Sequence, residues 1–519
     1  PFIRHIKVSR QISTLPQYDI KATTWQVCDS LTVGDFTAVG YFFAKKISQE
    51  LNIPIGLVNA SWGGTNIETW ISRGAFESSD EFKEMIASMP LVKLDSMIDI
   101  KVQAVAKRVE PLQESKLKNI NTTFFKETTF DDSRWPELSV PLHWERQELG
   151  ELDGVVWLRK SIVLTAVNTA KPATLELSRI DDDDITYVNG VKVGSTNQWD
   201  AKRKYAIPAG LLVEGKNTIA IRVVDTGGGG GIYGNTNDLR LTIDQTVVEL
   251  SGKWRYQVES IQSSLNVNAF PSLAYNAMIH PLIPFAFNGV LWYQGESNAP
   301  RAYQYRKAFP LLIEDWRKKW NTNFPFYYVQ LATFTTAGNS NLGSDWAELR
   351  EAQTRTLQLP NTGMCVTTDI GNPADIHPTN KQDVGKRLAA LALNGVYKHQ
   401  TVCSGPTFKD MQIKGNEITV SFDNVHGGLT TPDQYEYIKG FEVAGSDQVF
   451  YYAKAAIKNN TIVVSSEKVQ QPSAVRFGWV GDASDCNLFN AEGFPAVPFR
   501  TDQWKTITTD EKYKIEKLK

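Results

Sequence analysis

Two stretches of this sequence alternate between short apolar runs and longer segments whose apolar residues recur at helical spacing. Val39, Phe43, Ile47 and Leu51, for example, lie on one face of a helix. The expected strands cover residues 3–8, 53–58, 290–293, 326–331 and 364–369, and the expected helices cover 36–51, 302–320, 344–357 and 380–396. Strands that alternate with helices favour a parallel sheet covered by helices. The sequence therefore predicts an α/β domain.

Between and after these stretches the apolar residues recur with a period of two. Residues 155–158, 185–190 and 218–224 are examples, and Asn189-Gly190 is a strong hairpin signal. The same pattern returns at 417–422 and 461–464. We expect the α/β domain in two parts, 1–124 and 259–402, with an inserted β-sandwich at 125–258 and a C-terminal β module at 403–519.

Composition excludes several classes of protein. The formal net charge of −2 gives no electrostatic reason to expect nucleic acid as a partner. No apolar run approaches the roughly 20 residues of a membrane helix, so we expect no membrane insertion. The four cysteines form no Cys-x-x-Cys pair, and we expect neither a metal nor a cofactor. The five glycines Gly227–Gly231 lack the spacing of a phosphate loop and indicate conformational freedom.

Polar loops follow two of the expected strands. Gln294-Gly-Glu-Ser-Asn298 follows the run 290–293, and Asn59-Ala-Ser-Trp-Gly-Gly-Thr65 follows the strand at 53–58. In an open α/β sheet, loops at the carboxyl ends of strands collect ligands and catalytic groups. Glycines let a backbone approach a ligand and aim N–H groups at it. An ordinary tight turn is the alternative for the second loop.

A third loop, between the strand ending at Asp369 and the helix starting near Asn380, contains Asp375 and His377. Histidine moves protons near neutral pH and needs a carboxylate to hold its tautomer. In an extended loop, a spacing of two places both side chains on the same side. The loop therefore offers a general base and its orienting partner, with a solvated surface histidine as the alternative.

Four motifs together resemble the sialate O-acetylesterase family of SGNH (GDSL-like) hydrolases. They are residues 59–65, 292–298, 346–353 and 375–381, and the resemblance extends over most of 1–505. It implies an SGNH-like three-layer α/β/α hydrolase domain, interrupted by a jelly-roll-like, galactose-binding-like β-sandwich and followed by a β module. It also implies a secreted or periplasmic esterase that uses a serine nucleophile to remove acetyl groups from a carbohydrate such as sialic acid.

The resemblance assigns roles to residues of this chain. His377 would be the general base and Asp375 its orienting partner. Either Gly63 or Gly64 would donate a backbone N–H to the oxyanion, and either Asn298 or Gln294 would add a side-chain donor. Glu296 and Arg350 would bind substrate, shape the site or act as structural partners.

The family carries its nucleophile in a Gly-Gln-Ser-Asn-like block upstream of the segment that resembles Ile3–Arg10. This chain starts at Pro1 without such a block. We therefore expect the serine to lie upstream, and this chain alone to be nearly inactive unless the missing piece stays associated. Ser61 and Ser297 are weaker internal candidates, because both positions have other roles in the family.

Three other functions fit parts of the pattern. The aromatic residues and the sandwich suit a non-catalytic carbohydrate-binding protein. An acetyl xylan esterase would use the same residues on another glycan. A glycoside hydrolase would pair Glu296 with Glu348 or Asp375.

Overall fold

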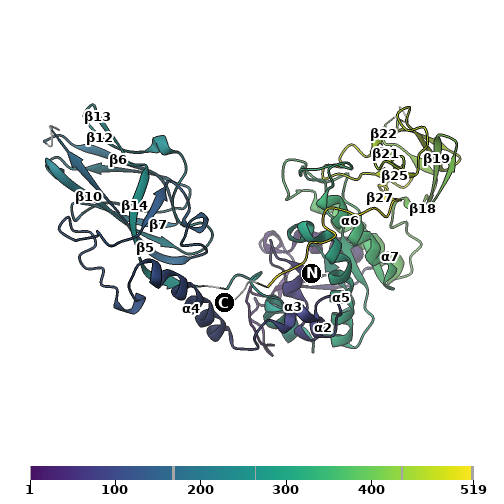
Figure 1. Ribbon diagram of the computed structural model, residues 1–519. Helices are drawn as coiled ribbons and strands as arrows, with labels where there is room; N and C mark the ends of the chain where they lie inside the picture. The colour runs from purple at the N-terminus through teal and green to yellow at the C-terminus, as the bar shows by residue number, and fades with distance from the viewer. Residues whose placement is uncertain (1, 166–169, 264, 434–436, 516–519) are drawn as a thin grey trace. The chain divides into compact units, whose positions relative to one another are not determined.

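The computed structural model describes residues 2–165, 170–263, 265–433 and 437–515, and it is a mixed α/β protein (Figure 1). Packing divides the chain into two compact units. Unit 1 combines the chain up to Val92 with the chain from Val267 onward, and unit 2 is Lys93–Asn266. No helix among the described residues has the length and apolar character needed to cross a membrane.

The α/β part of unit 1 contains the four expected helices and a strand at or near each of the five expected positions, but the fifth strand ends at Cys365 and not at Asp369. The strands are β1 (Ile3–Lys7), β3 (Ile55–Asn59), β15 (Val290–Trp292), β16 (Phe326–Val329) and β17 (Thr362–Cys365). The main helices are α1 (Ala38–Leu51), α5 (Ala302–Trp320), α6 (Asp345–Arg355) and α7 (Lys381–Gly395), and the short helices are α2 (Arg73–Glu77) and α3 (Lys83–Ala87).

These strands form two small sheets. In the first, β1 runs parallel to β3, and β2 (Gln26–Val27) is antiparallel at the outer edge. In the second, β15, β16 and β17 are all parallel. One core joins both sheets to α1 and α7, because Ile55 of β3 and Leu291 of β15 pack against the same cluster as Tyr327. The two sheets therefore share one core.

The opposite face of the second sheet is covered by α5. Phe309 of α5 contacts Trp292, Phe326 and Tyr328, with ring centroids 6.3, 6.0 and 4.9 Å away. Tyr327 instead belongs to the core shared with α1 and α7. Successive strand residues point to opposite faces, so helices cover both sides of β15–β17.

Unit 2 contains two antiparallel sheets around one core. The orders are β4-β14-β5-β10-β7-β8 and β11-β6-β12-β13, with β9 paired to β6. The strands are β4 (Glu137–Val140), β5 (Asp153–Leu164), β6 (Ala173–Asp181), β7 (Asp183–Val188), β8 (Val191–Asn197), β9 (Lys202–Ile207), β10 (Gly215–Asp225), β11 (Gly231–Tyr233), β12 (Leu239–Ile243), β13 (Thr246–Glu249) and β14 (Gly252–Gln262). The hairpin signal is confirmed: Asn189 and Gly190 join β7 to β8 with φ of 47° and 84°.

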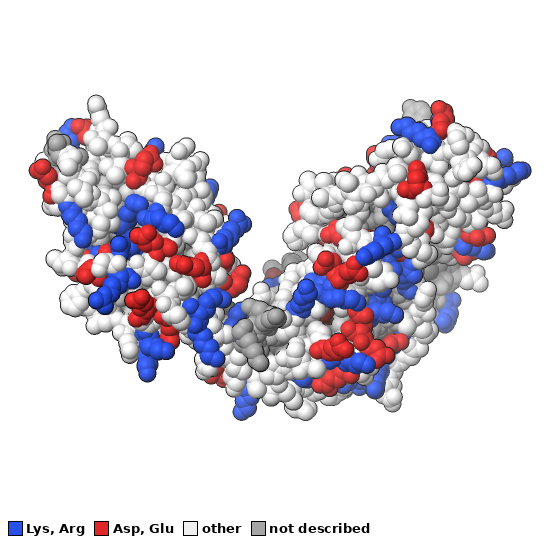
Figure 2. Space-filling view, viewed as in Figure 1, with Lys and Arg blue, Asp and Glu red and all other residues white. Residues whose placement is uncertain are grey.

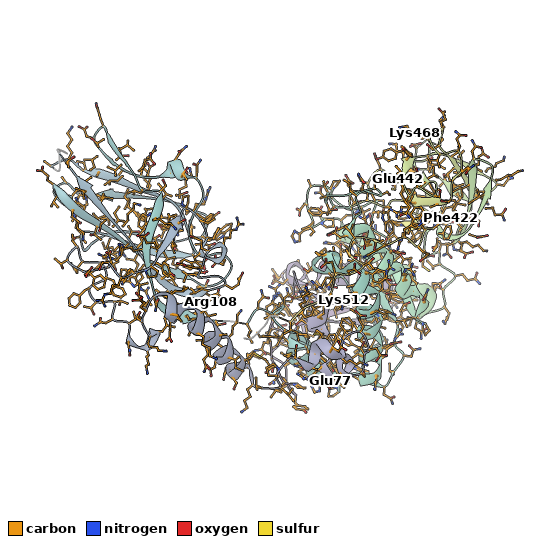
Figure 3. The ribbon with its side chains drawn as sticks, viewed as in Figure 1. Glu77, Arg108, Phe422, Glu442, Lys468 and Lys512 are labelled. Atoms are coloured by element: carbon orange, nitrogen blue, oxygen red, sulfur yellow. The ribbon has the colours of Figure 1, made fainter. Side chains whose placement is uncertain are left out.

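Packing places helix α4 (Leu94–Leu112) in unit 2, although the expected boundary lay at residue 124. Val105 and Val109 of α4 belong to the unit 2 core. Arg108, labelled in Figure 3, donates to the carbonyl oxygen of Glu151 at 2.6 Å. Just after α4, Gln113 accepts from the backbone N–H of Val258 in β14 at 2.9 Å. The division into four domains stays a prediction.

The C-terminal strands are antiparallel and belong to unit 1. One sheet has the order β18-β19-β24-β23, a second has β22-β21-β25-β27, and β20 pairs with β26. Their bounds are β18 (Thr407–Lys414), β19 (Glu417–Asp423), β20 (Leu429–Thr430), β21 (Phe441–Ala444), β22 (Tyr451–Tyr452), β23 (Lys454–Lys458), β24 (Thr461–Ser465), β25 (Ala474–Phe477), β26 (Phe489–Asn490) and β27 (Phe499–Arg500). Charges of both signs are mixed over the visible face of each unit (Figure 2).

Candidate active site

The polar loops that follow β3 and β15 meet through the side chain of Gln294. Its Nε2 donates to the carbonyl oxygen of Thr65 at 2.8 Å and to Oδ1 of Asn298 at 2.7 Å. Its Oε1 accepts from the Tyr305 hydroxyl of α5 at 3.0 Å. Both amide protons of Gln294 are therefore used inside the protein, and this buried side chain has no N–H left for a ligand.

Asn298 is the second buried amide of this site. Its Oδ1 accepts from the backbone N–H of Ile67 at 2.8 Å, and its Nδ2 donates to Glu68 at 3.0 Å. An amide group has two N–H protons, so one remains after the bond to Glu68. Of the two side-chain oxyanion donors expected from the sequence, Asn298 can still donate, whereas Gln294 would first have to break an internal bond.

Gly63 and Gly64 form an exposed turn before the buried Thr65. Gly64 has φ of +73°, which favours glycine, and a Cβ at either glycine would meet no atom within 4 Å. The turn is fixed because the Thr65 hydroxyl donates to the carbonyl of Trp62 at 2.8 Å and accepts from Trp70 Nε1 at 2.9 Å. Backbone at the two glycines is therefore open to a ligand.

The two internal serine candidates lie in these loops. The Ser61 hydroxyl donates to Oδ1 of Asn59 at 2.7 Å. An amide oxygen, not a histidine, thus holds its proton. Ser297 is half-buried in the short 3-10 helix Glu296–Arg301.

His377 and Asp375 form the expected pair. His377 Nδ1 lies 3.2 Å from Asp375 Oδ1, which also accepts from the His377 backbone N–H at 2.8 Å. That backbone bond is the first cause that lowers the pKa of Asp375, which keeps the carboxylate ionised. With Nδ1 held by the carboxylate, Nε2 is the nitrogen that can take a proton. The His377 side chain is 86% exposed, so this nitrogen is accessible.

Charged groups connect the His377 loop with the loop after β15. Burial raises the pKa of Glu296, while the positive charges of Lys381 and His377 oppose that rise. The Lys381 ammonium lies 4.9 Å from the ring centre of Tyr293. Burial lowers the pKa of Lys381, and Glu296 and Asp375 counteract this. Glu296 and the His377–Asp375 pair therefore belong to one electrostatic site.

Arg350 is fully buried and holds backbone together. Its guanidinium donates to the carbonyl oxygens of Leu331, Ala332, Val480 and Gly481 at 2.7–2.9 Å. Burial lowers its pKa to about 10. Of the roles that the sequence left open for Arg350, these contacts favour the structural one.

Glu348 and Glu68 are buried carboxylates with protein partners. Glu348 accepts from the backbone N–H groups of Ile507 and Thr508 at 3.0 and 3.2 Å, and from the Thr508 hydroxyl. Glu68, which the sequence analysis missed, accepts from Asn298 and from Arg301. In the sequence, only its position shortly after Gly63 and Gly64 indicates that Glu68 lies near the candidate site. Among the described residues, no three His, Cys, Asp or Glu side chains could hold a metal ion.

This chain is similar in sequence to a known protein family and to several of its members. Residues 267–394 match the sequence model of a family described as carbohydrate esterase, sialic acid-specific acetylesterase. The sialate O-acetylesterase of Mus musculus is 36% identical over 259 residues, which cover 44% of this chain and 47% of that protein. The Homo sapiens sialate O-acetylesterase is 31% identical over 267 residues, covering 44% and 48%. The chain thus spans about half the length of these curated relatives.

A solved structure is similar over nearly the whole chain. It is that of a carbohydrate acetylesterase from Xanthomonas citri, with 27% sequence identity and a TM-score of 0.59. The match covers 97% of this chain and 73% of the other.

Proposed function

Because residues 267–394 match the sialic acid-specific acetylesterase family model and a carbohydrate acetylesterase structure is similar over nearly the whole chain, we propose that the chain belongs to this family and acts as a carbohydrate O-acetylesterase. The substrate is an acetyl ester on a sugar, such as 9-O-acetylated sialic acid. The observation that carries this proposal is the hydrogen-bonded His377–Asp375 pair. It lies after a parallel strand, in one electrostatic site with the loop that carries Asn298.

Each site residue has a defined role in the proposed ester hydrolysis. A serine hydroxyl attacks the acetyl carbonyl carbon while His377 Nε2 takes its proton, and Asp375 stabilises the imidazolium. The carbonyl oxygen becomes an oxyanion that accepts from Asn298 Nδ2 and from a backbone N–H of Gly63 or Gly64. His377 then protonates the departing sugar oxygen. Water, deprotonated by His377, then attacks the acyl carbon; His377 returns the proton to the departing serine oxygen, and acetate is released.

The sheet edges support a place for the nucleophile. β3 pairs with β1 and β15 pairs with β16, and among the described residues neither has a strand partner on its other side. Both strands pack on the same core, and the loops at their carboxyl ends are bonded through Gln294 and Thr65. A parallel strand between them would end beside the glycine turn and Asn298. We assign that position to a further parallel strand whose following loop carries the nucleophilic serine.

The proposal extends to the domain types and the cellular compartment. Unit 1 is an SGNH-like three-layer hydrolase domain followed by a β module, unit 2 is a galactose-binding-like jelly-roll sandwich, and the protein is secreted or periplasmic. The glycosidase alternative loses one of its pairs, because the carboxylate of Glu348 is occupied by Ile507 and Thr508. Cell fractionation checks the compartment.

A serine-reactive fluorophosphonate tests the proposed function. In a protein that contains the proposed serine-bearing strand we expect one adduct, on that serine, because the proposal places its hydroxyl beside His377. The 519-residue chain alone should stay unlabelled. Peptide mass spectrometry locates the adduct. Labelling of Ser61 or Ser297 would reassign the nucleophile to this chain.

Replacing Asn298 by alanine tests the oxyanion assignment. In the full-length enzyme we expect kcat to fall by about 10²–10³ with a smaller change in KM, because the donor acts on the transition state. Steady-state hydrolysis of an aryl acetate gives both constants. The variant also loses the bond to Ile67, so its melting temperature should fall and assays should be run well below it. Asn394→Ala, at an exposed position of α7, is the matched control. An unchanged kcat in Asn298→Ala would remove Asn298 from the oxyanion site.

A further inference from the structure

Unit 2 contains a cluster of buried polar atoms that the esterase chemistry does not use. Among the described residues, Glu145 Oε1, Asp225 Oδ2 and His143 Nδ1 are buried without a hydrogen-bond partner. Asp225 is 0% exposed. All three atoms lie around the glycine-rich loop Thr226–Gly231, which connects β10 to β11. Buried polar atoms without a hydrogen-bond partner are rare, and each one costs free energy of folding. Three such atoms around one loop therefore need a physical explanation.

The loop rests directly on the two carboxyl groups. The Gly230 N–H donates to Glu145 Oε2 at 2.9 Å, and the Gly227 N–H donates to Asp225 Oδ1 at 3.0 Å. A Cβ at Gly230 would lie 2.5 Å from Asp225 Oδ2 and 2.0 Å from the Trp144 ring. At Gly229 it would lie 2.6 Å from His143 Nδ1. Only glycine fits at positions 229 and 230 when the loop lies this close, so these two glycines of the run have a steric reason.

The surroundings are rich in negative charge. Groups that act on the two carboxyls or on their neighbours are Glu151, Asp153, Asp181, Asp182, Arg203 and Arg146. Arg203 is committed to Asp184, with Nε and Oδ1 3.0 Å apart. The backbone N–H and hydroxyl of Thr226 donate to Asp182. Burial lowers the pKa of His143, which keeps its imidazole neutral. Among the described residues, neither Glu145 nor Asp225 forms an ion pair with a Lys or Arg side chain, and the charges that act on both are carboxylates.

Protonation is the remaining way to neutralise two buried acids. Burial, reinforced by neighbouring carboxylates, raises the pKa of Glu145 to about 7 and that of Asp225 to about 7. An ionised buried carboxylate without a counter-charge is costly. Opening the loop would let water solvate the carboxylates.

We propose that Glu145 and Asp225 form a proton-operated latch on the loop Thr226–Gly231. With both carboxyls protonated, the loop lies closed on them. When they lose their protons to solvent, the carboxylates hydrate and the loop opens. The pH, and not a substrate, therefore decides whether this loop of unit 2 is closed or open.

The direction of the pH effect follows from linkage. The closed loop binds protons that the open loop, with ordinary acid pKa values near 4, releases. The contribution of the two carboxyls to closure is therefore fully present below about pH 4 and weakens as the pH rises to about 7, above which it levels off. His143, whose pKa is lowered in the closed state, acts in the opposite direction as the pH falls. In that window the opening constant rises by up to about tenfold per pH unit for each carboxyl.

Hydrogen–deuterium exchange of the 519-residue protein tests the latch. After correction for intrinsic exchange rates, protection of the Gly227 and Gly230 amides should fall by more than tenfold between pH 5 and pH 7. Peptides of the unit 2 core strand β5 should keep their protection. Equal protection of the loop at both pH values would overturn the proposal.

Neutral variants of the same shape separate the effect of the titrating protons from that of the hydrogen bonds. Asp225→Asn and Glu145→Gln keep the acceptor oxygens for Gly227 and Gly230 but remove the titrating protons. Each should reduce the pH dependence and retain loop protection at pH 7, and if one variant fails to fold the other decides. Glu249→Gln, exposed on β13, is the control and should behave as the unchanged protein. Restoration of protection at pH 7 by millimolar Ca²⁺ in the unchanged protein would also overturn the proposal, since the cluster would then be a cation site.

Discussion

Replacing His377 by alanine in the full-length protein should lower kcat for an aryl acetate by about four to six orders of magnitude. The reason is that, in the proposed mechanism, Nε2 of His377 takes the serine proton: Nε2 is accessible, while Nδ1 lies 3.2 Å from Asp375 Oδ1. Asp375→Asn should cost about 10⁴, because the amide no longer fixes the tautomer or stabilises the imidazolium. Release of the aryl alcohol, followed by absorbance, measures both effects.

His426→Ala is the matched control for His377→Ala, because His426 is an exposed histidine of the C-terminal β module. It should leave kcat and KM unchanged. If His377→Ala retains more than about a tenth of the activity, the general base lies elsewhere. The proposed mechanism would then fail even if the protein remains an esterase.

Replacing Arg350 by methionine should destabilise unit 1 by about 3–5 kcal/mol. Methionine fills similar volume but leaves the carbonyls of Leu331, Ala332, Val480 and Gly481 without this donor. Arg350→Lys should restore only part of the loss, because an ammonium cannot reach all four oxygens with a planar fork. Urea unfolding followed by tryptophan fluorescence measures the change.

Arg355→Met provides the comparison on the same helix. Arg355 is 38% exposed and pairs with Glu351 at 2.8 Å, and an ion pair of this kind contributes about 0–1 kcal/mol. If both variants lose a similar free energy of unfolding, the four hydrogen bonds of Arg350 contribute no more than an exposed ion pair. A large difference, with residual activity in Arg350→Met at low temperature, assigns Arg350 to structure.

The periodicity of the sequence was enough to predict the α/β elements and the Asn189-Gly190 hairpin, because both depend on local patterns. The rule for carboxyl ends of parallel strands also drew attention to the loops after β3 and β15, whereas the bond between them through Gln294 appears only in the structure. Local patterns carry no information on which core an amphipathic helix joins, so α4 was separated from unit 2. They also do not reveal whether a polar residue is buried, so the bonds of Glu68 and the four carbonyl partners of Arg350 appear only in the structure. The catalytic roles of His377, Asp375, Gly63, Gly64 and Asn298 stay predictions.

The bond between Gln113 and Val258 bears on how the chain reaches this structure. Unit 1 is built from two segments separated by all of Lys93–Asn266, and closing a long disordered loop costs entropy and slows pairing of distant segments. Unit 2 is continuous in sequence and joins its entry helix α4 to its exit strand β14 through that bond. Once unit 2 has folded, it replaces a long flexible loop by a compact connection. We therefore expect unit 2 to form first and the core of unit 1 to assemble after it, so that destabilising mutations in unit 2 slow the folding of unit 1.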